Sequence, residues 1–130
     1  MSIFDKVFGN NGSKGTPSSS IEWIELTEIQ QLDDIVTESA ETPALIFKHS
    51  TRCSISRFAL KNFESEYAID GDKLKPYFLD LLEHRNISNE IASRFGVMHQ
   101  SPQVILIKDG KAIYNSSHSD IDAGKVKERI

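Results

Sequence analysis

The chain has 130 residues, which is enough for one domain with a packed core. It is 38% hydrophobic and 26% charged, a composition typical of globular proteins. The formal net charge of −4 disfavours nucleic acid as the main partner, because the phosphate backbone binds basic surfaces. The longest apolar runs are too short to span a bilayer, so no membrane partner is expected.

Residues 1–20 are expected to be an N-terminal tail and flexible linker, and residues 21–130 to form the domain. The segment 9–20 contains mostly glycine, serine and asparagine, a composition typical of linkers. Residues 1–9 lack the apolar core of a signal peptide, so a cytoplasmic location is expected. Four apolar residues of the tail would share one face of a helix, and a frayed end is favoured over a docking peptide; they are Ile3, Phe4, Val7 and Phe8.

The first half of the domain is predicted to alternate strands with helices. Residues 21–26 predict a strand, and Thr-Glu-Ile-Gln at 27–30 predicts a capping box that opens a helix. That helix ends before Pro43, because proline lacks the N–H that would continue it. The apolar run 44–48 predicts a buried central strand, and apolar residues at helical spacing after Cys53 predict a second helix.

The second half is predicted to close the sheet with a hairpin at Asp109-Gly110. Strands joined through helices pair in parallel, and the hairpin adds antiparallel strands. The chain is therefore expected to be an α/β protein with a central mixed β-sheet and helices on both faces. This order resembles the thioredoxin-like fold, in which the reactive cysteine lies between a central strand and the next helix. The remaining expected elements are strands at 76–82, 103–107 and 111–115, a helix at 86–95 ending at Gly96, and a last helix to Ile130 capped through Ser119-x-x-Asp122.

Cys53 is the only cysteine and occupies that junction between strand and helix. The chain therefore cannot form an internal disulfide, and Ser56 stands where a Cys-x-x-Cys motif would have its second thiol. A reactive Cys53 must act through a mixed disulfide with another molecule. A single thiol also fits a reducing compartment.

The residues around Cys53 favour its thiolate form. A helix that begins near this residue would direct unpaired backbone N–H groups at the sulfur, and Thr51 is a suitable helix cap. Arg52 and Arg57 add positive charge, and Ser56 is placed to donate a hydrogen bond to the thiolate. The alternative is an inert structural cysteine, which describes most lone cysteines. The arginines, the serine and the helix start favour the functional interpretation.

Ser101-Pro102 precedes the third apolar strand. A proline at such a place is usually trans, but in thioredoxin-like folds a cis-proline here faces the active cysteine. We therefore expect a cis bond, with the Ser101 backbone facing Cys53 and pairing with a bound thiol substrate. For Gln103 an exposed strand position is favoured over a substrate contact. The partner and tautomer of His49 cannot be assigned from sequence.

Several linked segments make the chain resemble the monothiol bacilliredoxins, also called YtxJ-like or bacillithiol system redox-active proteins. The resemblance spans residues 21–130, although Ser54 stands where that family usually has proline. The residues that carry it are Phe47-Lys48-His49-Ser50-Thr51-Arg52-Cys53-Ser54-Ile55-Ser56, Leu79-Asp80-Leu81-Leu82-Glu83-His84-Arg85, Asn89-Glu90-Ile91-Ala92 with Phe95-Gly96-Val97, and His99-Gln100-Ser101-Pro102-Gln103-Val104-Ile105-Leu106-Ile107 with Gly110.

The resemblance implies a monothiol thiol–disulfide oxidoreductase that removes bacillithiol from protein mixed disulfides through Cys53. The partners implied are thiolated proteins and the small thiol, which is a co-substrate; no bound cofactor or metal is expected. The alternatives are a non-catalytic thioredoxin-like adaptor or redox-sensing module and, more weakly, iron–sulfur binding across a dimer. The expected site comprises Cys53, Ser56 and Arg52 as catalytic residues, with substrate contacts from Thr51, Arg57, Ser101 and Pro102.

Overall fold

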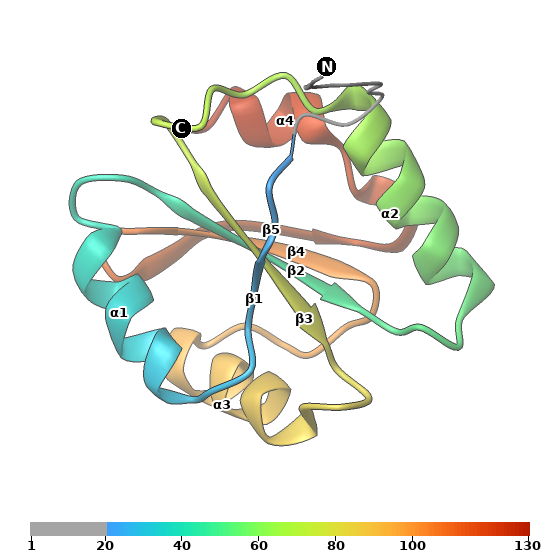
Figure 1. Cartoon of the computed structure of the whole chain (residues 1–130), viewed down its shortest axis with the longest axis horizontal. Helices are drawn as coiled ribbons and strands as arrows, with labels where there is room; N and C mark the ends of the chain where they lie inside the picture. Colours follow the sequence, from blue (N-terminus) through green and yellow to red (C-terminus); the bar gives the residue numbers. More distant parts are fainter. Residues whose placement is uncertain (1–20) are drawn as a thin grey trace, which may run out of the picture.

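The computed structural model describes residues 21–130 (Figure 1). The expectations for the N-terminal tail and linker, residues 1–20, lie outside the described residues. Within the described part, strands and helices follow the predicted order β-α-β-α-β-α-β-β-α, with one short 3-10 helix before the last helix. The predicted α/β architecture is therefore confirmed.

The five strands form one mixed sheet in the order β1-β3-β2-β4-β5. The first three run parallel, and β4 pairs with both β2 and β5 in the antiparallel sense. Strand β2 is therefore central, with a parallel neighbour on one side and an antiparallel neighbour on the other. The strands are β1 (Ile24–Glu25), β2 (Ala44–His49), β3 (Lys75–Asp80), β4 (Gln103–Lys108) and β5 (Lys111–Ser117).

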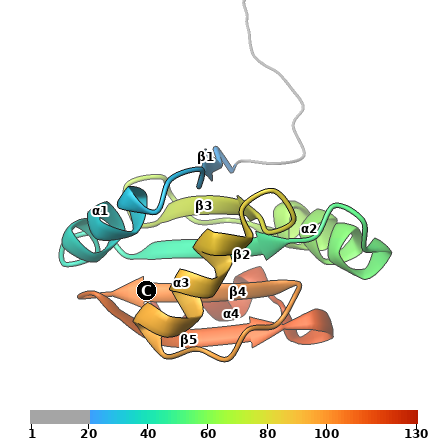
Figure 2. The ribbon, with the colours of Figure 1, turned by 90° about the horizontal axis from the view of Figure 1, so that it is seen from below.

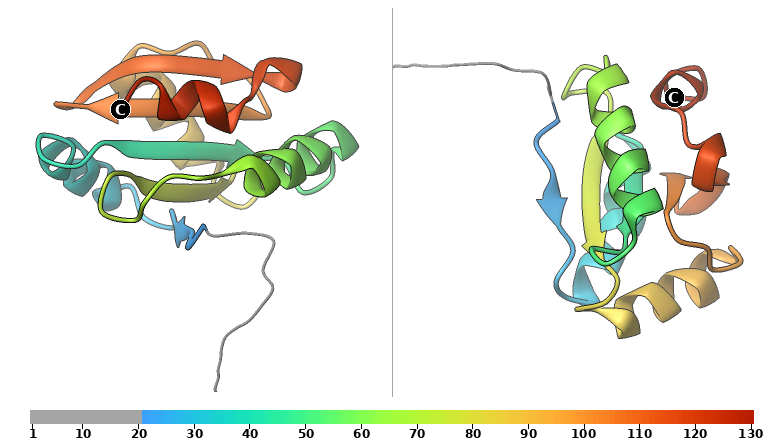
Figure 3. Two further views of the ribbon diagram at one scale, coloured as in Figure 1. Left: turned by 90° about the horizontal axis from the view of Figure 1, so that it is seen from above. Right: turned by 90° about the vertical axis from the view of Figure 1, so that its right-hand side faces the viewer.

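Helices cover both faces of the sheet. Figure 2, seen from below, shows α1 (Gln30–Glu38) and α3 (Arg85–Phe95) in front of the sheet. Figure 3 shows α2 (Ser54–Glu66) and α4 (Ala123–Lys127) on the opposite face, after the 3-10 turn η1 (His118–Asp120).

The alternation of side chains along each strand creates two apolar clusters. On β2, Ile46 belongs to the cluster under α1 and α3, whereas Phe47 belongs to the cluster under α2 and α4. On β4, Ile105 and Leu106 divide in the same way. All six residues of β2 are buried, as expected for a central strand covered on both faces.

Glycine and aspartate end two elements as predicted. Gly96 has a φ of +64° and ends α3, a conformation that is strained for residues with a Cβ atom. Asp109 and Gly110 both have positive φ, 54° and 74°, in the tight turn that joins β4 to β5.

Two predicted helix caps are wrong in detail. Helix α1 has Ile29 as its N-cap, and the amide that reaches back is Gln31, whose Oε1 accepts from the backbone N–H groups of Thr27 and Glu28 at 2.8 and 3.0 Å. Helix α4 is capped by Asp122 alone, which accepts from Gly124 and Lys125 at 2.7 and 3.2 Å. The predicted Ser119 cap lies in η1, because a turn intervenes that the sequence spacing does not reveal.

The last helix ends earlier than predicted, at Lys127, and the first strand is reduced to two residues, Ile24 and Glu25. A strand at the sheet edge has one neighbour only, so fewer of its residues take part in pairing; here β1 pairs with β3 alone.

We predict that Asp122→Ala lowers the free energy of unfolding by about 1 kcal/mol, because two backbone N–H groups lose their acceptor. Ala123 and Val126 of this short helix are buried, so the loss affects its packing. Urea unfolding measures the change. The matched control is Ser119→Ala, which removes an exposed hydroxyl outside the observed cap and should change stability by less than about 0.5 kcal/mol. Equal losses in the two variants would contradict the assigned cap.

Candidate active site

Cys53 lies where β2 leaves the sheet and α2 begins. After β2 a turn closes with the Cys53 N–H donating to the Ser50 carbonyl at 3.1 Å. Cys53 is itself the N-cap of α2, with extended backbone angles (φ −106°, ψ 121°), and its carbonyl accepts the first helical bond, from Arg57 N–H at 3.1 Å. Its side chain is partly exposed and is a free thiol. A thiolate here would lie at the positive end of the helix dipole.

Thr51 was predicted to cap this helix, and that prediction is wrong because the capping position is held by Cys53. The Thr51 carbonyl instead accepts a hydrogen bond at 3.1 Å from the guanidinium of Arg57, on the first turn of α2. Arg57 therefore ties the loop before Cys53 to the helix after it. The contact also places a cation beside the loop that carries the thiol.

Ser56 is fully buried, and its hydroxyl bonds back to the strand end. Its Oγ accepts from the Ser50 N–H at 3.0 Å and lies 2.8 Å from His49 Nδ1. The hydrogen bond to the thiolate predicted for Ser56 is not among these contacts. With the imidazole proton on Nε2, the Ser56 hydroxyl donates to Nδ1; with the proton on Nδ1, the ring donates and the hydroxyl hydrogen is free to turn toward Cys53.

His49 is buried at the end of β2, opposite Asp80 of β3. Burial lowers its pKa, the negative charge of Asp80 partly opposes this, and Arg57 adds to the lowering. The imidazole is therefore predominantly neutral at pH 7. A neutral ring can either accept or donate at Nδ1, depending on its tautomer, whereas a cationic ring can only donate.

Arg52 and Thr51 are exposed and line a hollow between the loop before Cys53 and the end of β3. Its other lining residues are Asp80, the last residue of β3, and Leu82 and Glu83, which follow that strand. The hollow thus contains the guanidinium of Arg52, the residue directly before Cys53, and the carboxyl groups of Asp80 and Glu83. Such a hollow suits a small polar molecule that carries both signs of charge.

The pairing of β2 with β4 brings Ser101 and Pro102 to the same end of the sheet as Cys53. Lys48 on β2 is opposite Gln103 on β4, and the strands are antiparallel, so the residues after Lys48 lie beside those before Gln103. Figure 1 shows the connection from α3 to β4 passing the end of β2 where the chain turns toward α2. The Ser101-Pro102 bond is cis, as expected, and Pro102 is buried. The Ser101 hydroxyl is buried, and none of residues 21–130 provides it with a hydrogen-bond partner.

Two buried polar residues near this site were not recognised from the sequence. Gln103 was expected to be exposed, but it is buried, and its amide bonds to the backbone of Met98 and Gln100. Lys48 was read only as the end of an apolar strand, yet its ammonium is buried and lies 2.8 Å from His99 Nδ1. A lysine directly after four apolar strand residues was the available signal, since buried lysines are rare.

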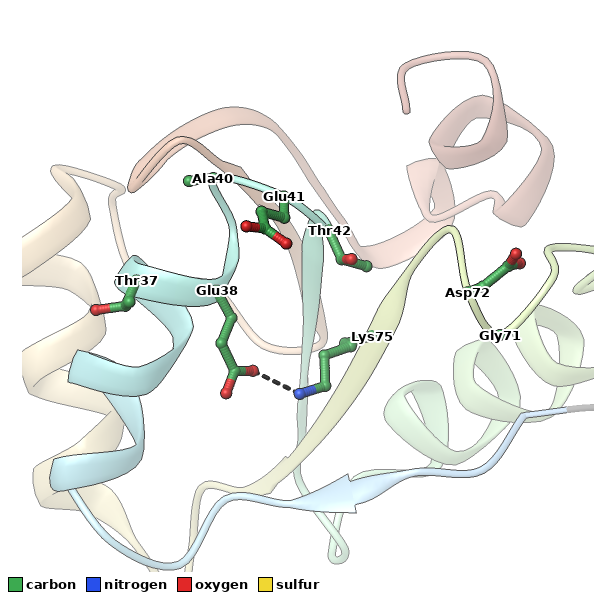
Figure 4. Close-up of a pocket in the computed structure, with 8 residues that line it drawn as sticks. All are labelled: Thr37, Glu38, Ala40, Glu41, Thr42, Gly71, Asp72 and Lys75. Atoms are coloured by element: carbon green, nitrogen blue, oxygen red, sulfur yellow. Dashed lines mark hydrogen bonds and ion pairs between the residues drawn. The ribbon is translucent and has the colours of Figure 1, made fainter.

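A separate hollow lies at the opposite end of the sheet (Figure 4). It is formed by the end of α1 and the start of β3, and an ion pair between Glu38 and Lys75 spans it. None of the predicted site residues lines it. The predicted site residues therefore all lie away from this hollow, around Cys53 and the start of β4.

Comparison with known families agrees with this geometry. The sequence model of the family described as monothiol bacilliredoxin BrxC matches residues 24–126. The chain belongs to this family. The match includes Cys53, the buried Ser56 and the Ser101-Pro102 bond, so the bacilliredoxin assignment covers the whole candidate site. Family and fold together support a thiol redox function.

Solved structures show the same fold. A protein described as a suspected oxidoreductase with a thioredoxin fold is 28% identical, with a TM-score of 0.69, over 81% of this chain and 90% of that one. The thioredoxin of Malassezia sympodialis is 18% identical (TM-score 0.65), with 85% of this chain and 90% of that chain covered. The thioredoxin of Fasciola hepatica is 19% identical (TM-score 0.60), with 82% and 94% covered. The bacilliredoxin described here therefore has a thioredoxin-like fold. In residues 21–130, no helix has the length and apolarity needed to cross a bilayer.

We predict that the buried Lys48 makes stability depend on pH. Burial lowers its pKa from 10.5 to about 8. Below pH 8 the ammonium is charged in both states, and the folded state carries the full cost of burying it. Between pH 8 and 10.5 the folded protein binds fewer protons than the unfolded chain, so the free energy of unfolding rises with pH.

The variant Lys48→Met lacks this contribution, so the wild type should gain up to about 3 kcal/mol relative to the variant between pH 7 and pH 10.5. Urea unfolding at the two pH values gives the difference, and the titration of groups that do not interact with Lys48 cancels between the two proteins. A difference that stays constant over this range would show that Lys48 keeps its ordinary pKa when folded.

Proposed function

We propose that this protein is a monothiol thiol–disulfide oxidoreductase that removes bacillithiol from protein mixed disulfides. The observation that supports the proposal most is the pairing of a partly exposed thiol at the start of α2 with a buried serine, Ser56, in place of a second thiol. Such a site can form a mixed disulfide with an outside thiol, but it cannot release that thiol by closing on itself.

The first step transfers the small thiol to the protein. The Cys53 thiolate attacks the bacillithiol sulfur of the target's mixed disulfide, and a new S–S bond forms between Cys53 and bacillithiol. The target's S–S bond breaks, and its sulfur leaves as a thiolate with the electron pair of that bond. The target is thereby reduced, and Cys53 becomes oxidised to a mixed disulfide.

The second step regenerates Cys53 with another bacillithiol molecule. Its thiolate attacks the bacillithiol sulfur bound to Cys53, and bacillithiol disulfide leaves while Cys53 returns as a thiolate. The two steps together reduce the target sulfur and oxidise one free bacillithiol, which leaves as a disulfide with the bacillithiol that the target had carried. The proposal needs no bound cofactor, and the small thiol is a co-substrate.

The residues around Cys53 have separate proposed roles. Arg52, exposed beside the hollow, would contact the malate carboxylates of bacillithiol, and a planar guanidinium suits such groups. Arg57 and Thr51 would hold the loop that meets the substrate, through the bond between them. The backbone of Ser101 would pair with the bound thiol substrate beside Pro102. Ser56 would support the reaction indirectly, by orienting His49 and by holding the loop before Cys53 through the Ser50 N–H.

The proposed partners are thiolated proteins and the small thiol, without nucleic acid or membrane. A single thiol that is used for exchange fits a reducing compartment, and we propose the cytoplasm. The test of the whole proposal is release of bacillithiol from a purified bacillithiolated protein, followed by mass spectrometry of both proteins. A Cys53 adduct of bacillithiol mass should appear during turnover. Binding of the target without release would favour the adaptor instead.

We predict that Cys53→Ser abolishes release of bacillithiol, because no other thiol exists in the chain. Activity is measured by the return of free thiol on the target protein. Cys53→Ala should behave in the same way, and it also removes the hydroxyl that serine would leave. Release by either variant at the wild-type rate would refute a mechanism through Cys53.

We predict that Ser56→Cys converts the site to a dithiol that forms an internal disulfide. The side chain at position 56 is buried one helical turn from Cys53, as a second thiol would need to be. Oxidation should reduce the number of free thiols from two to none, measured by thiol titration on the unfolded protein. The matched control Ser54→Cys adds an exposed thiol on the neighbouring residue and should not close on Cys53 as readily. Equal oxidation of both would contradict the assigned geometry.

A further inference from the structure

Lys48 and Gln103 form a buried polar pair under the segment that leads to Pro102. They are directly opposed in the β2–β4 ladder, so their side chains lie on the same face of the sheet. That face carries Ile46 and Ile105, two residues before and after them, and is covered by α1 and α3. Lys48 has no exposed surface and Gln103 has 1%. The pair therefore lies on the face opposite to Ser56 and α2.

Both side chains of the pair make polar contacts with the connection between α3 and β4. The Gln103 amide donates from Nε2 to the Met98 carbonyl at 3.1 Å, and its Oε1 accepts from the Gln100 N–H at 3.3 Å. Lys48 Nζ lies 2.8 Å from Nδ1 of His99, the residue between them. Three consecutive residues are thus held by two side chains from adjacent strands.

The contact with Lys48 also fixes the state of His99. An ammonium group can only donate, so Nδ1 of His99 must accept, and its ring proton is on Nε2. Ser88 of α3 approaches the same nitrogen at 3.3 Å. Burial and the nearby charges of Lys48 and Arg85 lower the pKa of His99, which keeps the ring neutral and able to accept.

We propose that Lys48 and Gln103 are positioning residues that hold the segment 98–100 in place and thereby set where the Ser101 backbone meets a substrate bound at Cys53. This inference rests on the proposed function. Burying an ammonium and an amide is unfavourable compared with burying apolar groups of the same shape. The two side chains provide hydrogen-bond partners for residues 98–100, which lie outside any helix or strand and directly before Ser101.

The location of the segment argues for a role in substrate binding in addition to stability. Met98 is 79% exposed and His99 is also exposed, so the held residues present side chains to solvent at the Cys53 end of the sheet. Cys53 itself is held by different bonds, from Ser50 and α2. Loosening the segment should therefore weaken substrate binding and leave the chemistry of the free thiol unchanged.

The test compares Gln103→Met, which keeps the length of the side chain and removes both bonds, with Val104→Ala. Val104 is the next residue on β4, buried on the opposite face, so its variant lowers stability without touching the segment. We expect Gln103→Met to raise KM for a bacillithiolated protein by about tenfold, as for two lost hydrogen bonds. Lys48→Met should also raise KM. For each, kcat and the rate of alkylation of Cys53 by iodoacetamide should stay within about twofold of wild type, and Val104→Ala should leave all three values unchanged.

A second measurement does not depend on activity. Amide hydrogen exchange at Gln100 should become at least tenfold faster in Gln103→Met, because its N–H loses its acceptor, while exchange at Ile105 in the strand stays slow. Slow exchange at Gln100 in the variant, or a KM no higher than that of Val104→Ala, would overturn the positioning role. If wild type fails to release bacillithiol, the proposed function fails, and the exchange result still decides whether Gln103 holds the segment.

Discussion

The antiparallel register between β2 and β4 is the constraint on which the site depends. The two halves of the site come from residues about fifty positions apart, the loop after His49 and the loop before Gln103. A shift of β4 by one residue against β2 would turn Gln103 to the face opposite Lys48 and move Ser101 away from the level of the Cys53 loop. The apolar residues of both central strands prevent such a shift, because each is buried in a cluster on its own face.

Buried polar groups are concentrated where these two strands approach Cys53. On one face His49 and Ser56 satisfy each other, and on the other Lys48 and Gln103 hold the neighbouring segment. Toward the opposite end, the same strands contain only apolar buried side chains, such as Leu45. Each polar pair reduces the hydrophobic stabilisation of the sheet and in return fixes a loop that has no regular structure. This asymmetry separates an apolar half of the two strands from a polar half that fixes the loops of the candidate site.

The fold and the position of the thiol could be predicted because they depend on local patterns. The apolar runs, the Asp109-Gly110 turn and the Gly96 stop are each encoded within a few residues, and the topology follows from their order. Exact caps could not be predicted in the same way, since Gln31 and Asp122 compete with equally suitable neighbours. The contacts of Ser56, Gln103 and Lys48 depend on residues distant in sequence or on which face a side chain takes, and no local pattern encodes either.

The contrast between Ser56 and a second thiol shows how one atom limits the chemistry of the site. A sulfur at this buried position would be one helical turn from Cys53 and would compete with outside thiols for any mixed disulfide. The oxygen accepts from Ser50 and pairs with His49 instead, so the group that would resolve the disulfide stabilises the loop. Under the proposed function, the mixed disulfide would persist until a second small thiol arrives, and its lifetime would depend on how well the surrounding surface admits that thiol. Access of that thiol through the hollow beside Arg52 and over the segment held by Gln103 would then limit the turnover of the proposed reaction.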